Sequence, residues 1–105
     1  MDHILKHIHF LELLGNPSSQ QQAKALISTS SPDQMDIISE LALNLLKERI
    51  ELSRYYKDKL IKEATVIRQL ANRGLGSKKR KKVALSNIKT LEVLLKVCLK
   101  HIRDG

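Results

Sequence analysis

Aromatic residues are nearly absent from this chain, which has no tryptophan and only three rings, Phe10, Tyr55 and Tyr56. So few rings disfavour a surface that binds nucleic acid by stacking successive bases. Cys98 is the only cysteine, so no disulfide can form within the chain, which fits a reducing compartment. The chain also lacks the apolar run of about 18–20 residues that spans a bilayer, and its start lacks the pattern of a signal peptide. We expect an intracellular protein that is not secreted and has no membrane partner.

Glycine and proline are scarce, at four and two residues, whereas good helix formers such as Leu, Lys, Ala and Gln are plentiful. Apolar residues make up 42% of the chain, which favours a folded protein over a disordered one. No segment shows the sustained period-two alternation of a half-buried strand. We therefore predict an all-α fold, a compact bundle of four to five helices in a single domain spanning residues 1–105, with a basic segment before the last helix.

Start and stop signals divide the chain into helices. Ser31-Pro32-Asp33-Gln34 is the clearest start, because Ser31 can cap the helix, Pro32 suits its first position and Gln34 completes a capping box. Ser18 and Gln21 have the same spacing, and Gly15-Asn16-Pro17 stops the helix before them. Residues 31–73 form either one helix or two, with Ser53 as the start of the second. Helices are predicted over 2–14, 18–27, 31–51, 54–73 and 86–102.

Positive charge is concentrated in the second half of the chain. Residues 1–50 hold four Lys or Arg against six Asp or Glu, whereas residues 51–105 hold fifteen against five. Five consecutive cations form the densest part, which we call the basic run: Lys78, Lys79, Arg80, Lys81 and Lys82. Five adjacent cations cannot all be buried without counter-charges, so we expect them to face water or an anionic partner. Such asymmetry indicates a polyanion, most often nucleic acid.

The basic run would occupy the first turns of a helix capped by Ser77, where cations oppose the helix dipole. We therefore expect segment 74–82 to be frayed or extended without its partner, and its residues to serve binding more than folding. Phosphate contacts need only accessible cations, and no cluster of base-reading side chains is recognisable, so binding should be largely independent of sequence. The predicted nucleic-acid-binding residues are Lys78, Lys79, Arg80, Lys81, Lys82, Arg73 and Lys62.

Other chemistry has weak support in the sequence. His3 and His7 are four residues apart, a spacing that can bind a metal, but no third ligand lies near them and no Cys pair is present. Cys98 falls on the apolar stripe of the last helix and is best interpreted as a small buried hydrophobe. The chain has no phosphate-binding glycine loop of P-loop spacing. We expect no enzyme activity, no metal or other cofactor and no small-molecule substrate.

The last helix is apolar around much of its circumference. Such a helix is either central to the bundle or buried against a partner. The second alternative predicts a homo-oligomer whose interface contains Leu94, Leu95, Val97 and Leu99.

The order of motifs resembles that of small basic helical proteins of Maverick/Polinton-type elements and adintoviruses. The resemblance rests on Ser31-Pro32-Asp33-Gln34, on the apolar segment 38–46, on Leu52-Ser53 and on the basic run after 67–71. It implies a virion core-like protein, comparable in role to proteins that condense viral DNA. That family often continues with a Gly-Gly-Phe segment and a small-residue apolar tail, whereas this chain continues with Leu85-Ser86-Asn87-Ile88 and an amphipathic helix.

Two functions follow as expectations. The first is a non-enzymatic nucleic-acid-binding protein, with DNA favoured over RNA, that packages a viral or virus-like genome and is nuclear or virion-associated. The alternative is a helical assembly or protein-interaction module, capsid-associated or homo-oligomeric, whose basic run is a nuclear-import signal or contacts an acidic partner.

Overall fold

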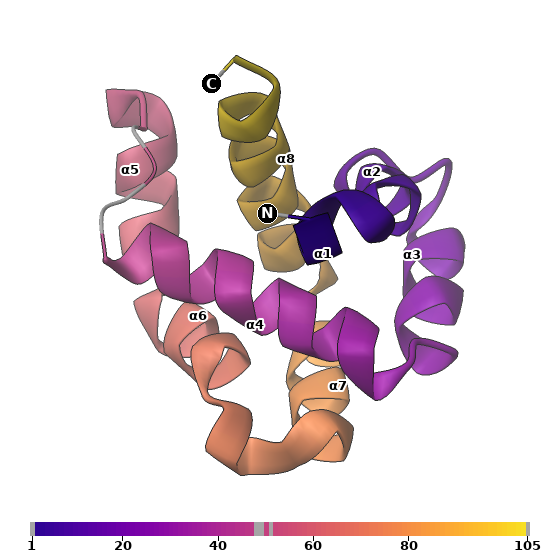
Figure 1. The fold of residues 1–105 in the computed structure, drawn as a ribbon. Helices are drawn as coiled ribbons and strands as arrows, with labels where there is room; N and C mark the ends of the chain where they lie inside the picture. Colours follow the sequence, from indigo (N-terminus) through magenta and orange to yellow (C-terminus); the bar gives the residue numbers. More distant parts are fainter. Residues whose placement is uncertain (1, 48–49, 51, 105) are drawn as a thin grey trace.

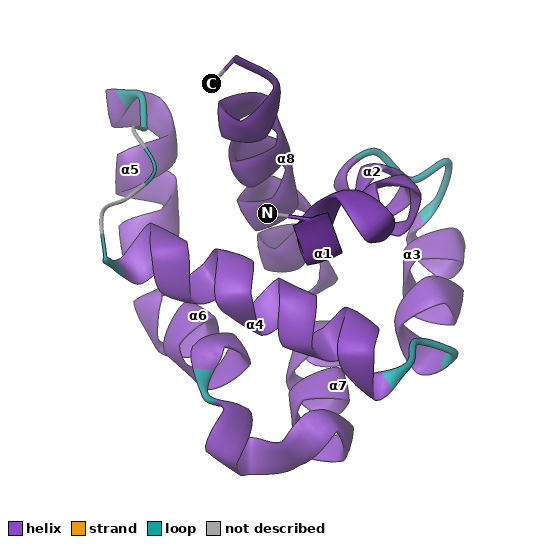
Figure 2. Cartoon of the chain, viewed as in Figure 1, coloured by secondary structure: helices purple, strands orange, loops and turns teal. Residues whose placement is uncertain are grey.

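The computed structural model describes residues 2–47, 50 and 52–104, and these residues form an all-helical fold without strands (Figures 1 and 2). The all-α prediction is confirmed. The predicted four to five helices are instead eight α-helices and one 3-10 helix in this part of the chain: α1 (Asp2–Lys6), α2 (Ile8–Gly15), α3 (Gln20–Ser28), α4 (Pro32–Leu46), α5 (Arg54–Ile61), α6 (Ala64–Ala71), η1 (Arg73–Leu75), α7 (Gly76–Ser86) and α8 (Ile88–Asp104).

The additional helices arise where tight turns interrupt the predicted ones. The backbone N–H of His7 donates to the carbonyl of Ile4, three residues back, and this turn separates α1 from α2. The N–H of Glu63 donates to the carbonyl of Leu60 in the same way and separates α5 from α6. Such three-residue hydrogen bonds tighten a helix locally and let its axis change direction. Neither turn contains Gly or Pro, so the sequence gives no obvious signal for it.

The strongest predicted helix starts are confirmed. The Ser31 side chain accepts a hydrogen bond from the Gln34 N–H at 3.1 Å, and the Gln34 side chain accepts one from the Ser31 N–H at 2.8 Å. This is the predicted capping box at the start of α4. Ser53 caps α5, as predicted. The cap of α3 is shifted by one residue, because Ser19 rather than Ser18 accepts the N–H of the first turn.

Two predicted helix ends differ from the structure. Helix α4 ends at Leu46, earlier than the predicted end near Glu51, and Glu51 itself lies outside the described residues. The last helix begins at Ile88 and continues to Asp104. The described residues of 31–73 therefore contain three α-helices, α4, α5 and α6, rather than one or two.

Helix α8 lies at the centre of the core. Its side chains Leu91, Leu94, Leu95 and Cys98 are at most 1% exposed. Helix α2 packs along α8, and α4 crosses the molecule and packs on α6 (Figure 1). The α2–α8 contact is close at Gly15, where an added Cβ would lie 3.0 Å from Leu99 Cδ1. The buried apolar residues form one cluster, on which the basic helix α7 is supported.

Candidate nucleic-acid interface

Helix α7 carries the whole basic run and has two different faces. Arg80 and Ala84, four residues apart, are buried against the rest of the molecule. Lys78, Lys79 and Lys82 are exposed. Because Lys78 and Lys82 are also four residues apart, they lie on one side of the helix, and Lys79 lies near Lys82 at a spacing of three. Lys81 is half-buried at the side of the helix.

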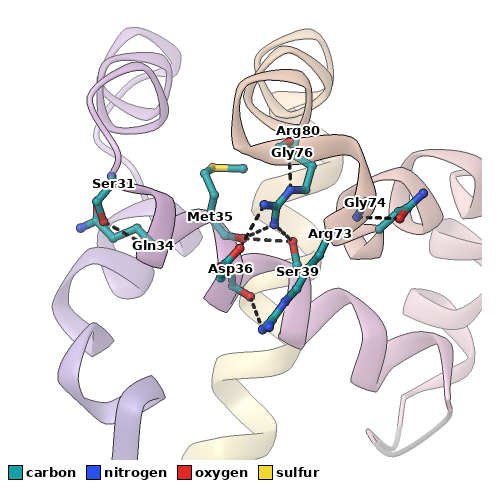
Figure 3. Close-up of polar contacts among 10 residues, drawn as sticks. Ser31, Gln34, Met35, Asp36, Ser39, Arg73, Gly74, Gly76 and Arg80 are labelled. Atoms are coloured by element: carbon teal, nitrogen blue, oxygen red, sulfur yellow. Dashed lines mark hydrogen bonds and ion pairs between the residues drawn. The ribbon is translucent and has the colours of Figure 1, made fainter.

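The inward face of α7 is fixed to α4 by Arg80 (Figure 3). Arg80 Nη2 lies 3.0 Å from Asp36 Oδ1, and Nη1 donates to Ser39 Oγ and, at 3.4 Å, to the Met35 carbonyl. Its Nε donates to the Gly76 carbonyl at 3.1 Å, within α7 itself. The Arg80 side chain is only 4% exposed, but its donors have partners on both helices. A buried guanidinium with this set of acceptors holds α7 in one orientation.

Arg73, just before α7, makes a second contact with α4. It precedes α7 in the 3-10 helix η1 and donates from Nη2 to the Asp36 carbonyl at 3.3 Å (Figure 3). Asn72 caps η1 by accepting the Gly74 N–H at 3.0 Å. Gly76 then has φ 76° and ψ 157°, a backbone conformation that is essentially restricted to glycine. These contacts explain how the chain turns sharply into α7.

The structure corrects two expectations about the basic run. The run is helical from its first residue, Lys78, and not extended. The expectation that all five cations face outward is wrong for Arg80, because its counter-charge, Asp36, lies within the chain. Arg80 is therefore not available to an external phosphate. It orients the helix so that Lys78, Lys79 and Lys82 point away from the core.

The other two predicted contacts lie outside the outward face of α7. Arg73 is exposed, and one of its nitrogens is engaged by α4. Lys62 is exposed at the end of α5, and α6 and η1 lie between it and α7 in the sequence. The structure thus groups three of the seven predicted residues on one outward surface, which we call the α7 lysine face: Lys78, Lys79 and Lys82.

The sequence around the α7 lysine face is rich in cations and contains no carboxylate. No acidic residue occurs in the sequence between Glu63 and Glu92, a segment that contains α6, η1, α7 and the start of α8. Asp36 on α4, which contacts α7, is paired with Arg80. The amino-terminal end of α7 adds the positive end of its dipole to the same region. No carboxylate within this segment of the sequence offsets the charge of the lysines.

The oligomer interface predicted on the last helix lies in the core of the structure and not on its surface. Leu94, Leu95, Val97 and Leu99 are buried within the chain, with exposures between 0% and 6%. The sequence left two positions open for the apolar last helix, the centre of the bundle or the interface with a partner. In the structure this helix lies at the centre of the bundle. These four side chains cannot contact a second copy unless the core opens.

The remaining candidates from the sequence show no assembled site. Burial raises the pKa of the Cys98 thiol to about 12, so the thiol is protonated near neutral pH and is a poor nucleophile. Within the described part of the chain, no three His, Cys, Asp or Glu side chains come together as metal ligands. The His3 side chain lies outside that part. No helix in the described residues is long and apolar enough to cross a membrane.

Comparisons with protein-family models, with curated proteins and with solved structures find no match to this chain.

Proposed function

We propose that this protein binds the phosphate backbone of duplex nucleic acid, DNA in preference to RNA, through the α7 lysine face. The proposal rests on the two faces of α7: buried Arg80 fixes the helix on the inner face, and three lysines lie on the outer face. Lysine ammonium groups bind phosphates as point charges without a shaped pocket. Binding needs no refolding of the run, because the helix is already formed.

The outward face also supports binding without sequence preference. Base reading in the major groove uses Arg, Asn or Gln side chains that make paired hydrogen bonds with base edges. The exposed residues of α7 are instead the three lysines, together with Gly76 and Ser86. The rise from Lys78 to Lys82 is about 6 Å along the helix axis. Over that length B-DNA presents more than three phosphate charges, at about one per 1.7 Å.

The experiment compares two triple variants by fluorescence anisotropy with a random-sequence DNA duplex across a salt series. Lys78→Ala/Lys79→Ala/Lys82→Ala removes the α7 lysine face but keeps Arg80. Lys6→Ala/Lys47→Ala/Lys57→Ala removes the same net charge from exposed positions elsewhere. We expect the first variant to lose most of the affinity and the second to keep it. Equal affinities for parent and α7 variant would refute the proposal, and the same titration with duplex RNA tests the preference for DNA.

The role as a virion core-like packaging protein stays a prediction of the resemblance. Its support here is the basic run on a stable helical body. A linear import signal of five consecutive cations has less support, because such a signal is read through accessible side chains and Arg80, in the middle of the run, is buried.

A second candidate function is that of a helical assembly module. Its contact surface would lie around Ile61 and not on the α8 residues that the sequence suggested. Ile61 is 62% exposed beside an apolar pocket of about 400 Å³ between the end of α4, α5 and α6. Exposed apolar side chains next to such a pocket are typical of contact surfaces. Light scattering at high concentration tests this candidate. A dimer that Ile61→Glu abolishes would support it, and a strict monomer would remove it.

A further inference from the structure

A second positively charged site lies away from α7, between the start of α5 and the second half of α8. It is a pocket of about 210 Å³ whose polar lining consists of Ser53, Tyr56, Lys96, Lys100 and His101. In Figure 1 this end of α5 and α8 is at the top of the molecule, whereas α7 is at the bottom. The pocket is smaller than the 300–1,000 Å³ typical of drug-sized ligands. Its size suits a small polar group.

The second half of α8 carries three cations, Lys96, Lys100 and Arg103, of which Lys96 and Lys100 line the pocket. Lys96 Nζ is paired with Glu92 at 3.2 Å, and Glu12 is paired with Arg103 at 3.5 Å. Lys100 is exposed and has neither of these carboxylates as an ion-pair partner. Lys100 and the neighbouring His101 both line the pocket, so an anion that enters it can contact them.

Two residues from the start of α5, Ser53 and Tyr56, line the same pocket. Ser53 caps α5, and its Oγ accepts the Tyr56 N–H at a long 3.5 Å. The first N–H groups of a helix have no partner within the helix, and the dipole favours an anion at that end. Tyr56 is among the lining residues, and a phenol can donate a hydrogen bond. Residues from the start of α5 and from the second half of α8 thus line the same pocket.

An exposed ring lies next to the pocket. Tyr55 is 66% exposed, and its ring contacts that of Tyr56 edge to face, with centroids 5.1 Å apart. The Lys59 ammonium lies 5.6 Å from the Tyr55 centroid. An exposed tyrosine beside cations offers a stacking surface for a flat base. This arrangement is independent of the α7 lysine face.

We propose that the pocket binds a phosphate monoester that carries a nucleobase. Lys100, His101 and the hydroxyls of Ser53 and Tyr56 contact the phosphate, and the base lies on the Tyr55 ring. The same chemistry is present in a free mononucleotide and in the 5′-phosphate end of a single strand. This binding adds a ligand class that the sequence did not suggest, and it does not depend on duplex binding by α7.

The experiment is an NMR titration of the full chain with AMP, with adenosine as the ligand that lacks the phosphate. We expect AMP at millimolar concentration to shift the His101 imidazole and the Tyr56 amide, and adenosine to shift neither. Lys100→Ala should raise the dissociation constant for AMP about tenfold, the effect of one charge-assisted hydrogen bond. Lys89→Ala, at the other end of α8, is the matched control and should leave it unchanged.

Four outcomes would overturn the proposal: no shifts at millimolar AMP, equal shifts with adenosine, unchanged affinity in Lys100→Ala, or shifts confined to α7. The variant that lacks the α7 lysine face should bind AMP as the parent does, which separates this proposal from the duplex-binding one. Competition by a 5′-phosphorylated oligothymidine distinguishes a site for free mononucleotides from a site for the 5′-phosphate end of a single strand. If the oligothymidine binds the site with a lower dissociation constant than AMP does, the site is assigned to strand ends. If its dissociation constant is higher, the site is assigned to free nucleotides.

Discussion

Arg80 on α7 and Asp36 on α4 form an ion pair across 44 residues of sequence, with Nη2 and Oδ1 3.0 Å apart. The pair is asymmetric, because the Arg80 side chain is 4% exposed and that of Asp36 is 40% exposed. Water therefore offsets part of the desolvation cost at the carboxylate, whereas the guanidinium depends on Ser39, Met35 and Gly76 for its other hydrogen bonds.

Replacing Arg80 should weaken the whole fold. Arg80→Ala leaves a void between α7 and α4 and removes every hydrogen bond of the guanidinium, so we expect a loss of about 3 kcal/mol in the free energy of unfolding. Lys79→Ala, one residue away on the exposed side, should change it by less than about 0.5 kcal/mol. Urea unfolding followed by circular dichroism measures both. Similar stabilities for the two variants would show that Arg80 does not fix α7.

The position of Arg80 illustrates what the sequence could and could not provide. The amphipathic stripe of α4 and the capping box of Ser31 with Gln34 are local patterns, and they predicted that helix start correctly. The burial of Arg80 depends on Asp36 and Ser39, which lie on another helix. One signal was present: the single arginine in the basic run is four residues before Ala84, and arginine suits buried ion pairs better than lysine.

The breaks between α1 and α2 and between α5 and α6 could not be predicted for a related reason. Helical propensity and apolar spacing continue through His7 and Glu63, so local preference favours an uninterrupted helix. Packing on α8 and α4 decides the direction of each segment, and the three-residue turns accommodate it. The α5–α8 pocket was missed too, because Ser53 and Lys100 are far apart in the sequence and neither belongs to a recognised motif.

Gly76 should be intolerant of a side chain. Its φ of 76° and ψ of 157° suit glycine alone, and an added Cβ would have no atom within 4 Å, so any cost comes from the backbone. We expect Gly76→Ala to lower the free energy of unfolding by about 1–3 kcal/mol. Ser77→Ala, at the next position, is the control and should cost less than about 0.5 kcal/mol. Chemical denaturation tests this, and a Gly76→Ala variant as stable as the parent would contradict it.

Cys98 should show its burial in both reactivity and pH dependence. Its thiol lies in the core, 3.9 Å from the Leu41 carbonyl, and burial raises its pKa from 9.0 to about 12. A thiol reagent should modify it only after unfolding.

The pH dependence follows from the sign of this shift. Between pH 9.0 and about 12 the unfolded chain loses the Cys98 proton while the folded chain keeps it. The stability from the protonated thiol is therefore complete below pH 9.0 and declines as the pH rises toward 12. The stability difference between the parent and Cys98→Ala should narrow over that window. A constant difference across it, measured by urea unfolding, would show that Cys98 does not titrate as described.

The salt dependence of duplex binding should report how many lysines contact phosphates. Each contact releases condensed counterions, so the slope of log affinity against log salt changes by about 0.9 per phosphate neutralised on B-DNA. Lys78→Ala, Lys79→Ala and Lys82→Ala should each lower the slope by about 0.9, and the triple variant by about three times that amount. Lys6→Ala, on α1, should leave the slope unchanged. Anisotropy titrations over a salt series measure these slopes, and the slope separates direct contact from a general loss of charge. If a single lysine variant weakened binding without changing the slope, that lysine would act through the fold, as Arg80 does, and not by contacting phosphate.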